Sequence, residues 1–291
     1  MLTPLGFKVQ DQLMRLTDDH RHRVIASVVV ALAFALLTRA PIAQDQAYHL
    51  FADQRPLFGI PNASNVLSNL GFLIVGLIGL RRCWCSFAAG PSPHFTHPAG
   101  AFPWVVFFVG LTLTASGSAY YHWAPSDDTL FWDRLPLSTT YTSLIAAVIF
   151  ERVGPRQGFF AVPLLLVFGV GSVGYWHHTE AAGEGDLRYY LFGQATAVVL
   201  VPLMVGLLPA RLTAGSDYLL AIAAYALAKL AEVEDSWVFS LGQWVSGHTL
   251  KHLFAAVAAG VLLRMLSRRS RITPAGALES PGTARVPEHR R

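Results

Sequence analysis

The stretch that decides the fold covers residues 116–136 and reads SGSAYYHWAPSDDTLFWDRLP. An apolar run that begins near Ala101 ends here, and a short acidic loop then carries Asp133 into the next apolar run. If the first run is helical, Ser118 and His122 lie four residues apart and share one face. Because a hydroxyl, an imidazole and a carboxylate are costly at the end of a membrane helix, we interpret Ser118, His122 and Asp133 as candidate functional residues.

A second pair of histidines stands far along the chain, near the start of the last apolar run. His248 and His252 are also four residues apart, so a helix would place both on one face. Together with His122 they supply three imidazoles from two helices. Three protein ligands and one open position are typical of catalytic zinc, so the pattern predicts a zinc site. The chain contains no HisGluXaaXaaHis motif, which argues against the site of a soluble metalloprotease.

The composition indicates a protein with several membrane-spanning segments. Of the 291 residues, 53% are hydrophobic and 14% are charged, and the mean hydropathy is +0.42. The net charge of +4 could suggest a nucleic-acid partner, but the basic residues lie in short loops and the C-terminal tail, where membrane topology explains them. We therefore expect no nucleic-acid partner. Cys83 and Cys85 lie close together in one predicted loop and form neither a disulfide framework nor a zinc knuckle.

The apolar runs predict an all-α fold, a bundle of seven transmembrane helices with one additional N-terminal transmembrane helix. A polar cytoplasmic segment, 1–23, precedes the additional helix at 24–40. The small residues after this run also resemble a signal-peptide cleavage site, but we expect the helix to be retained because the polar leader is long. The seven-helix domain covers 50–266, and 267–291 are interpreted as a disordered basic tail. The runs of the seven helices lie at about 63–80, 101–122, 135–151, 158–176, 188–208, 216–233 and 248–266.

The distribution of Lys and Arg predicts the orientation in the membrane. With eight spans, both termini and the loops near 81–100, 152–157 and 209–215 share one side, which carries most of the basic residues. The opposite side holds only a few, namely Arg39, Arg55, Arg134 and Arg188. Both termini are therefore expected in the cytoplasm. The candidate metal ligands, with Asp133, then lie toward the extracytoplasmic or periplasmic side.

Other polar residues at this side have simpler interpretations. His177 and His178 are expected in an exposed turn with Glu180 and Glu184, since adjacent helical residues point about 100° apart and cannot easily share an ion. Three asparagines that open the second span are expected to hydrogen-bond neighbouring helices: Asn62, Asn65 and Asn69.

Two lysines lie within predicted spans. Lys229 has Glu232 three residues further on, and an ion pair between them would make both tolerable in lipid. Lys251 is expected to extend to the outer membrane interface.

These residues resemble the motifs of the alkaline ceramidase family, within a wider group of seven-helix membrane hydrolases that includes the adiponectin-receptor-like proteins. The resemblance rests on Ser118 and His122, on Asp133 in AspArgLeuPro, on the pair His248 and His252, and on the stretch NASNVLSN at 62–69. It covers about residues 50–266. The helix at 24–40 is additional to the family pattern.

The resemblance implies a zinc ion held by His122, His248 and His252, with Ser118 and Asp133 completing a catalytic site. It also implies a membrane-embedded hydrolase that cleaves the amide bond of a ceramide-like lipid. Some members carry an acidic calcium-binding segment before the first shared helix. The corresponding stretch here offers chiefly Asp53 and Asn62 with Arg55 nearby, so calcium is not predicted.

Alternatives remain open from the residues alone. A heptahelical lipid sensor or receptor with a structural zinc would show no turnover, and a hydrolase of another lipid amide or ester would use the same residues. A transporter would carry charges deep in several helices, whereas here they gather at one end. Asp133 could act as the general acid and base, or it could orient a histidine ligand. The oligomeric state is left open.

Overall fold

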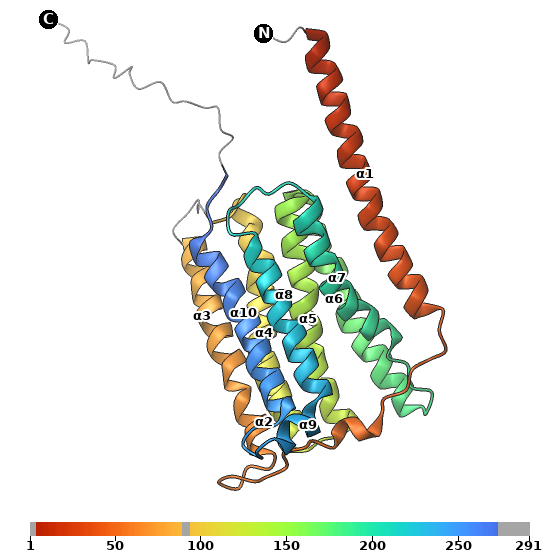
Figure 1. Cartoon of the computed structure of the whole chain (residues 1–291), viewed down its shortest axis with the longest axis vertical. Coiled ribbons are helices and arrows are strands. Elements are labelled where there is room, and N and C mark those ends of the chain that lie inside the picture. The colour runs from red at the N-terminus through yellow and green to blue at the C-terminus, as the bar shows by residue number, and fades with distance from the viewer. Residues whose placement is uncertain (1–3, 89–93, 273–291) are drawn as a thin grey trace, which may run out of the picture.

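The computed structural model describes residues 4–88 and 94–272, and Figure 1 traces them. The chain is all-helical, and its helices include the following elements. In order they are α1 (Pro4–Leu37), the 3-10 helix η1 (Gln46–His49), α2 (Ala63–Ser68), α3 (Leu70–Ala88), the 3-10 helix η2 (Pro98–Ala101), α4 (Phe102–Trp123), α5 (Asp127–Arg152), α6 (Pro155–Ala181), α7 (Arg188–Leu207), α8 (Ser216–Val233), α9 (Asp235–Ser240) and α10 (Gly247–Arg268).

The long helices from α3 onward form an up-and-down bundle (Figure 1). The largest helix-to-helix contacts join α4 with α5, α5 with α6, and α8 with α10, while α3 packs on both α4 and α10. Since the direction alternates, the C-terminal end of α4 and the N-terminal end of α10 meet at one end of the bundle. The short helices α2, α9 and η1 gather at this same end (Figure 1).

Helix α5 is the most polar long helix of the bundle from α3 onward, and it lies between α4, α6 and α7. Ser126 caps its N-terminus in a capping box with Thr129, and Asp127 and Asp128 occupy the first turn, where the helix dipole favours acids. Hydroxyl side chains further along bond back to carbonyls of their own helix, as Thr142 does to Ser138 at 2.7 Å. The helix therefore satisfies many of its hydroxyl groups through its own backbone.

Six helical segments of the described chain are long and apolar enough to cross a membrane. They are Asp18–Leu37, Ala63–Ser86, Pro98–Trp123, Pro155–Ala181, Arg188–Leu207 and Gly247–Arg268. The remaining two predicted spans are also helices, α5 and α8, but neither contains an equally long apolar stretch with so few charged side chains. The fold is thus a multi-helix bundle of membrane-protein character, with helices at all eight predicted ranges.

The predicted polar segment and the first predicted span belong to one helix within the described residues. Helix α1 runs without interruption from Pro4 to Leu37, and its part Asp18–Leu37 is long and apolar enough to cross a membrane. Figure 1 shows α1 standing apart from the bundle over much of its length, and its contacts are chiefly with α7. Arg188 fastens its end, because the guanidinium donates to the carbonyls of Leu37 and Arg39.

Several local predictions are wrong because the helices extend further than hydropathy indicates. Cys83 and Cys85 lie within α3 and not in a loop. Asp133 belongs to the second turn of α5, since the loop after α4 covers only 124–126. Of the predicted tail, 273–291 lie outside the described residues, whereas Arg269 is buried at 1% exposure and pairs with Glu151 at 2.5 Å.

Candidate metal centre and adjoining cavity

Three buried histidines meet where α4 ends and α10 begins. His122, His248 and His252 are 1%, 4% and 2% exposed. One ring nitrogen from each can be chosen so that all three lie within 4.8 Å of one another, and Nε2 of His122 is 3.2 Å from Nε2 of His252. The predicted convergence of these residues is therefore confirmed, and the group could hold a metal ion.

The start of α10 is fixed by contacts with the preceding helices. Ser246 caps the helix by accepting from the backbone N–H of Thr249 at 3.2 Å. The Asp235 carboxylate accepts from the backbone N–H of His248 at 2.7 Å. At Gly247 a Cβ would lie 2.1 Å from the carbonyl oxygen of Ala231, so only glycine allows this close approach to α8. These contacts fix the position of the first turn of α10 relative to α8 and α9, and with it the positions of His248 and His252 in the bundle.

Polar residues of α2 and its N-cap contact the two helices that carry the histidines. Ser68 Oγ lies 2.7 Å from Nδ1 of His252, which leaves Nε2 of that ring for a metal. Asn65 accepts from the Thr249 hydroxyl at 2.8 Å, and Asn62 donates to the backbone carbonyl of His122 at 2.8 Å. Asn62 and Asn65 therefore join helices, as predicted, whereas Asn69 donates to the backbone carbonyls of Asn65 and Val66 in its own segment. A hydrogen bond on the outer nitrogen of a histidine ligand is usual at metal sites because it fixes the ring.

Three imidazoles form a donor set that zinc and other transition metals accept. For zinc bonds of 2.0–2.1 Å in a tetrahedral site, ligand nitrogens lie about 3.3 Å apart; Nε2 of His122 and Nε2 of His252 are 3.2 Å apart, and all three ligand atoms lie within 4.8 Å of one another. Phe51 packs on His122 and His248, with ring centroids 4.6 and 4.7 Å away, and so shields the group from water. Nδ1 of His122 has no hydrogen-bond partner among the described residues, unlike Nδ1 of His252.

Ser118 and Asp133 lie beside this group as predicted, although Asp133 comes from a helix and not from a loop. Both are buried, and their side chains are in hydrogen-bonding contact. The contact depends on Gly117, where a Cβ would lie 2.0 Å from the carbonyl oxygen of Trp132. Glycine lets the backbones of α4 and α5 approach, and this approach brings the hydroxyl and the carboxylate together.

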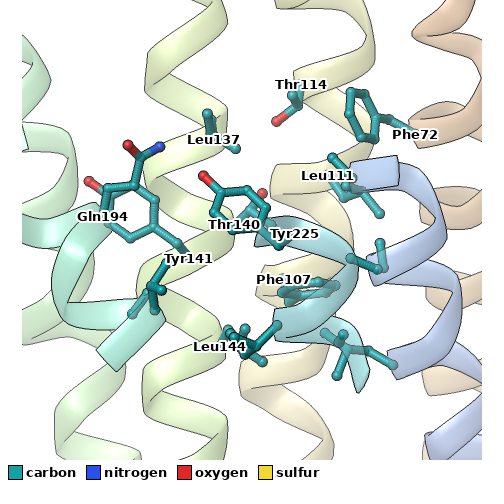
Figure 2. A pocket seen from close by; sticks show the side chains of 18 residues that line it. Phe72, Phe107, Leu111, Thr114, Leu137, Thr140, Tyr141, Leu144, Gln194 and Tyr225 are labelled. Atoms are coloured by element: carbon teal, nitrogen blue, oxygen red, sulfur yellow. The ribbon is translucent and has the colours of Figure 1, made fainter. Parts of the chain in front are cut away.

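A polar cavity of about 310 Å³ opens next to the histidines. Its wall includes Ser118, Asp133 and His252. Both predicted catalytic residues and one predicted metal ligand therefore line the same cavity. Beyond it lies an apolar cavity of about 120 Å³ between the helices (Figure 2). Six residues line both cavities, which makes them neighbours: Phe72, Thr114, Leu137, Gln194, Tyr225 and Ala255.

Two lysines share one carboxylate in the cavity wall. Glu232 pairs with Lys251 at 2.5 Å and with Lys229, and it accepts from the Tyr48 hydroxyl at 2.9 Å. The predicted pair of Lys229 and Glu232 is thus confirmed. The outward extension predicted for Lys251 is wrong, because its Nζ turns inward to Glu232 and lies 3.4 Å from Nε2 of His248.

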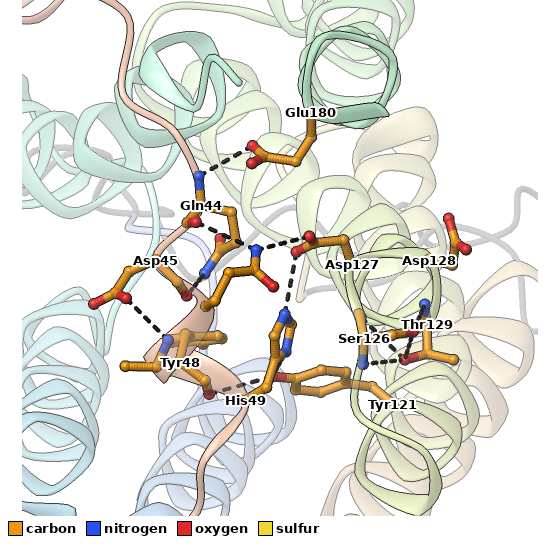
Figure 3. A network of polar contacts seen from close by, with 12 residues as sticks. Gln44, Asp45, Tyr48, His49, Tyr121, Ser126, Asp127, Asp128, Thr129 and Glu180 are labelled. Carbon is orange, nitrogen blue, oxygen red and sulfur yellow. Dashed lines mark hydrogen bonds and ion pairs between the residues drawn. The ribbon is translucent and has the colours of Figure 1, made fainter. Parts of the chain in front are cut away.

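The segment that carries η1 covers the cavity from outside, and a network of polar contacts attaches it (Figure 3). His49 lies 3.0 Å from the Tyr121 hydroxyl and 3.2 Å from the Asp127 carboxylate, and Gln46 donates to Asp127 at 2.9 Å. Burial raises the pKa of the Tyr48 phenol. Tyr48 therefore stays neutral and serves the cavity as a hydrogen-bonding group.

The remaining polar predictions have mixed outcomes. His177 and His178 lie in the last turns of α6 and not in a turn, and His177 bonds to Asp128 at 2.9 Å. Asp53 is held by Arg55 at 2.7 Å, and this hydrogen bond lowers the pKa of the Asp53 carboxyl.

Sequence reasoning missed Ser68 as a histidine partner, Phe51 as a cover and Arg134 as part of the cavity wall. Ser68 and Arg134 each lie close in sequence to a residue that was identified. The contacts of Phe51, Ser68 and Arg134 all join distant segments, which hydropathy and spacing do not report.

No family model matches this chain, and no curated protein matches it.

Proposed function

We propose that the protein is a zinc-dependent integral-membrane hydrolase that cleaves the amide bond of ceramide or a related lipid. The observation that carries the proposal is the position of the three histidines beside a polar cavity that adjoins an apolar one. A metal site with a purely structural role does not require such a space. The resemblance of the motifs around Ser118, His122 and Asp133 to alkaline ceramidases supports the same reaction class.

We also propose that α5 and α8 cross the membrane with the six more apolar helices, giving seven spans and the additional α1. Both termini would then be cytoplasmic, because most Lys and Arg residues gather at the bundle end opposite the histidines. Large aromatic side chains are exposed around the histidine end, as is typical of a membrane interface. They include Tyr120, Trp123, Trp132, Trp237 and Trp244.

The zinc, when bound, would supply a Lewis acid that lowers the pKa of water toward neutrality. Amide hydrolysis joins the water oxygen to the acyl carbon and breaks the C–N bond, so a proton must reach the leaving nitrogen. With a substrate bound, the Ser118 hydroxyl would exchange its contact with Asp133 for the acyl oxygen, a contribution of about 3 kcal/mol for one such donor. Asp133 would then take the proton from water and pass it to the nitrogen.

The contacts favour this role for Asp133 over that of orienting a histidine. Within the described chain, the hydrogen bond on His252 Nδ1 comes from Ser68, and Asp133 contacts Ser118. The carboxylate therefore faces the cavity, where a substrate amide would lie. The apolar cavity would receive the beginning of the acyl chain, since its wall is nearly free of charged groups.

Turnover by the purified, zinc-loaded protein tests the proposal. With short-chain ceramide in detergent micelles, we expect release of fatty acid, detected by mass spectrometry, that stops with a chelator and resumes with zinc. Ser118→Ala should lower kcat about 100- to 1,000-fold while zinc content stays unchanged. Bound zinc without turnover of any lipid amide or ester would instead support a lipid sensor with a structural metal.

A further inference from the structure

The polar cavity contains a buried cation that amide hydrolysis does not use. Arg134, on α5, is 6% exposed and lines the cavity. Its guanidinium carbon lies 4.2 Å from the ring centre of Trp176 and 5.0 Å from that of Tyr190. One terminal nitrogen, Nη2, donates to Gln44 Oε1 at 2.7 Å, whereas Nη1 has no hydrogen-bond partner among the described residues.

The other charged side chains of this wall are already occupied. Lys229 and Lys251 share Glu232, and Asp133 contacts Ser118. Asp45 lies at the exposed rim, where it accepts from the backbone N–H of Ala47 and caps η1. Arg134, by contrast, forms no ion pair within residues 4–88 and 94–272, and its direct contacts are aromatic rings and a neutral amide.

An unpaired buried cation is costly, and aromatic faces compensate only part of that cost. A guanidinium group with a free N–H binds an anionic oxygen most strongly, because the geometry and the charge both match. Arg134 shares its cavity with Ser118 and His252, and the apolar cavity continues beyond. A lipid whose chain lies in the apolar cavity could place its headgroup against Arg134.

We propose that Arg134 binds the anionic group of an amphiphile, so that the favoured substrate is an acidic amide lipid bearing a phosphate, sulfate or carboxylate. This inference rests on the proposed hydrolase function, because the acidic lipid is a substrate only if the protein cleaves it. The binding of an anionic amphiphile stands independently of turnover.

Binding is tested first, on the full chain in neutral detergent, by the shift in thermal unfolding midpoint. We expect dodecyl phosphate to raise the midpoint, and the uncharged 1-dodecylglycerol to raise it much less. Arg134→Gln should weaken the apparent affinity for dodecyl phosphate about 10- to 100-fold, the value of one charge-assisted hydrogen bond. Arg156→Gln removes an exposed positive charge at the opposite end of the bundle and should change nothing.

Two results of this experiment would overturn the proposal. An equal shift by dodecyl phosphate in wild-type protein and Arg134→Gln would show that Arg134 does not bind the anion. An equal shift by inorganic phosphate alone would show that the anion does not belong to a lipid.

Turnover separates substrate choice from the hydrolase function itself. The wild-type protein should prefer the 1-phosphate of a short-chain ceramide to the ceramide, and Arg134→Gln should lose kcat/KM for the phosphate about 10- to 100-fold, mainly through KM. Its kcat/KM for the uncharged ceramide should stay within about threefold. Equal losses for both substrates would mean that Arg134 supports Asp133 or the fold, and would overturn the assignment. If neither substrate is cleaved by wild-type protein, the hydrolase function fails while the binding result stays readable.

Discussion

At the scale of single residues, the site depends on side chains that hold the histidines in place. His252 is the clearest case, because Ser68 occupies its Nδ1 and leaves Nε2 facing His122 at 3.2 Å. Ring orientation of this kind raises metal affinity since less freedom is lost on binding. The serine belongs to α2 and the histidine to α10, so the contact depends on tertiary structure.

Replacing this serine tests its role. Ser68→Ala removes the hydrogen bond to His252, and we expect the affinity for zinc to fall about 10- to 100-fold with the fold retained. Competition with a fluorescent zinc chelator measures the change. Ser86→Ala is the matched control, because among the described residues Ser86 bonds within its own helix, to the carbonyl of Arg82. Equal zinc affinity in the wild-type protein and Ser68→Ala would contradict an orienting role.

How much of the site could be predicted is best seen residue by residue. Four-residue spacing identified His122 with Ser118, and His248 with His252, because helical periodicity is a local property. Lys251 was misjudged since its partner, Glu232, lies on another helix and draws the ammonium inward. Arg134 was counted only as a loop charge, although it is buried among aromatic rings.

At the scale of elements, close contact between α4 and α5 brings Ser118 to Asp133. The contact is possible because Gly117 has no side chain where the carbonyl of Trp132 passes. Hydropathy identified both helices but placed the start of α5 too late. The first turns of α5 contain acidic residues, so their hydropathy resembles that of a loop. The capping box at Ser126 and the burial of this segment stabilise it as a helix.

Substitution of this glycine should therefore damage the site through the helix pair. Gly117→Ala places a Cβ about where the Trp132 oxygen lies, and overpacking of this kind typically costs about 1–3 kcal/mol. We expect a lower unfolding midpoint and reduced turnover. Gly174→Ala is the control, because a Cβ there meets nothing within 4 Å on α6. If both variants unfold alike, the close approach at Gly117 is not what joins these helices.

At the scale of the whole molecule, two segments that connect helices each contain a carboxylate paired with an arginine two residues further along the chain. Asp53 bonds to Arg55, and Asp186 bonds to Arg188, which also contacts the end of α1. These hydrogen bonds lower the pKa of both carboxyls from the ordinary value of 3.8. Each pair therefore stabilises the fold above the unfolded-state pKa, and the stabilisation is lost as pH falls through the lower folded-state pKa.

Because the pKa values of the Asp53 and Asp186 carboxyls are lowered in the folded state, we expect the fold to lose stability in acid. In zinc-free protein, so that metal release plays no part, the unfolding midpoint should change little between about pH 8 and pH 5 and should fall below about pH 4. The double variant Asp53→Asn, Asp186→Asn should unfold at a lower temperature near neutral pH and lose less on acidification. A double variant with the same acid sensitivity as the wild-type protein would assign that sensitivity to other groups.

The overall architecture was largely predictable because apolar length and helical periodicity act locally. Helices occur at all eight predicted ranges, and six segments are apolar enough to span a membrane. The central position of α5 was not predictable, since its polar side chains make it resemble a surface helix. Some of these groups bond within α5 itself, while Glu151 accepts from Trp104 of α4 and Arg134 donates to Gln44 of the segment before η1. Only the packed bundle reveals this arrangement.

The most direct test of the account is the zinc content of the purified full chain, measured by mass spectrometry after dialysis against metal-free buffer. We expect one zinc per chain in the wild-type protein and in His178→Ala, whose histidine is exposed on α6. His122→Ala, His248→Ala and His252→Ala should each retain well below one-tenth of that content, because two imidazoles hold the ion far more weakly than three. Wild-type protein without zinc, or histidine variants that keep it in full, would contradict the proposed metal centre.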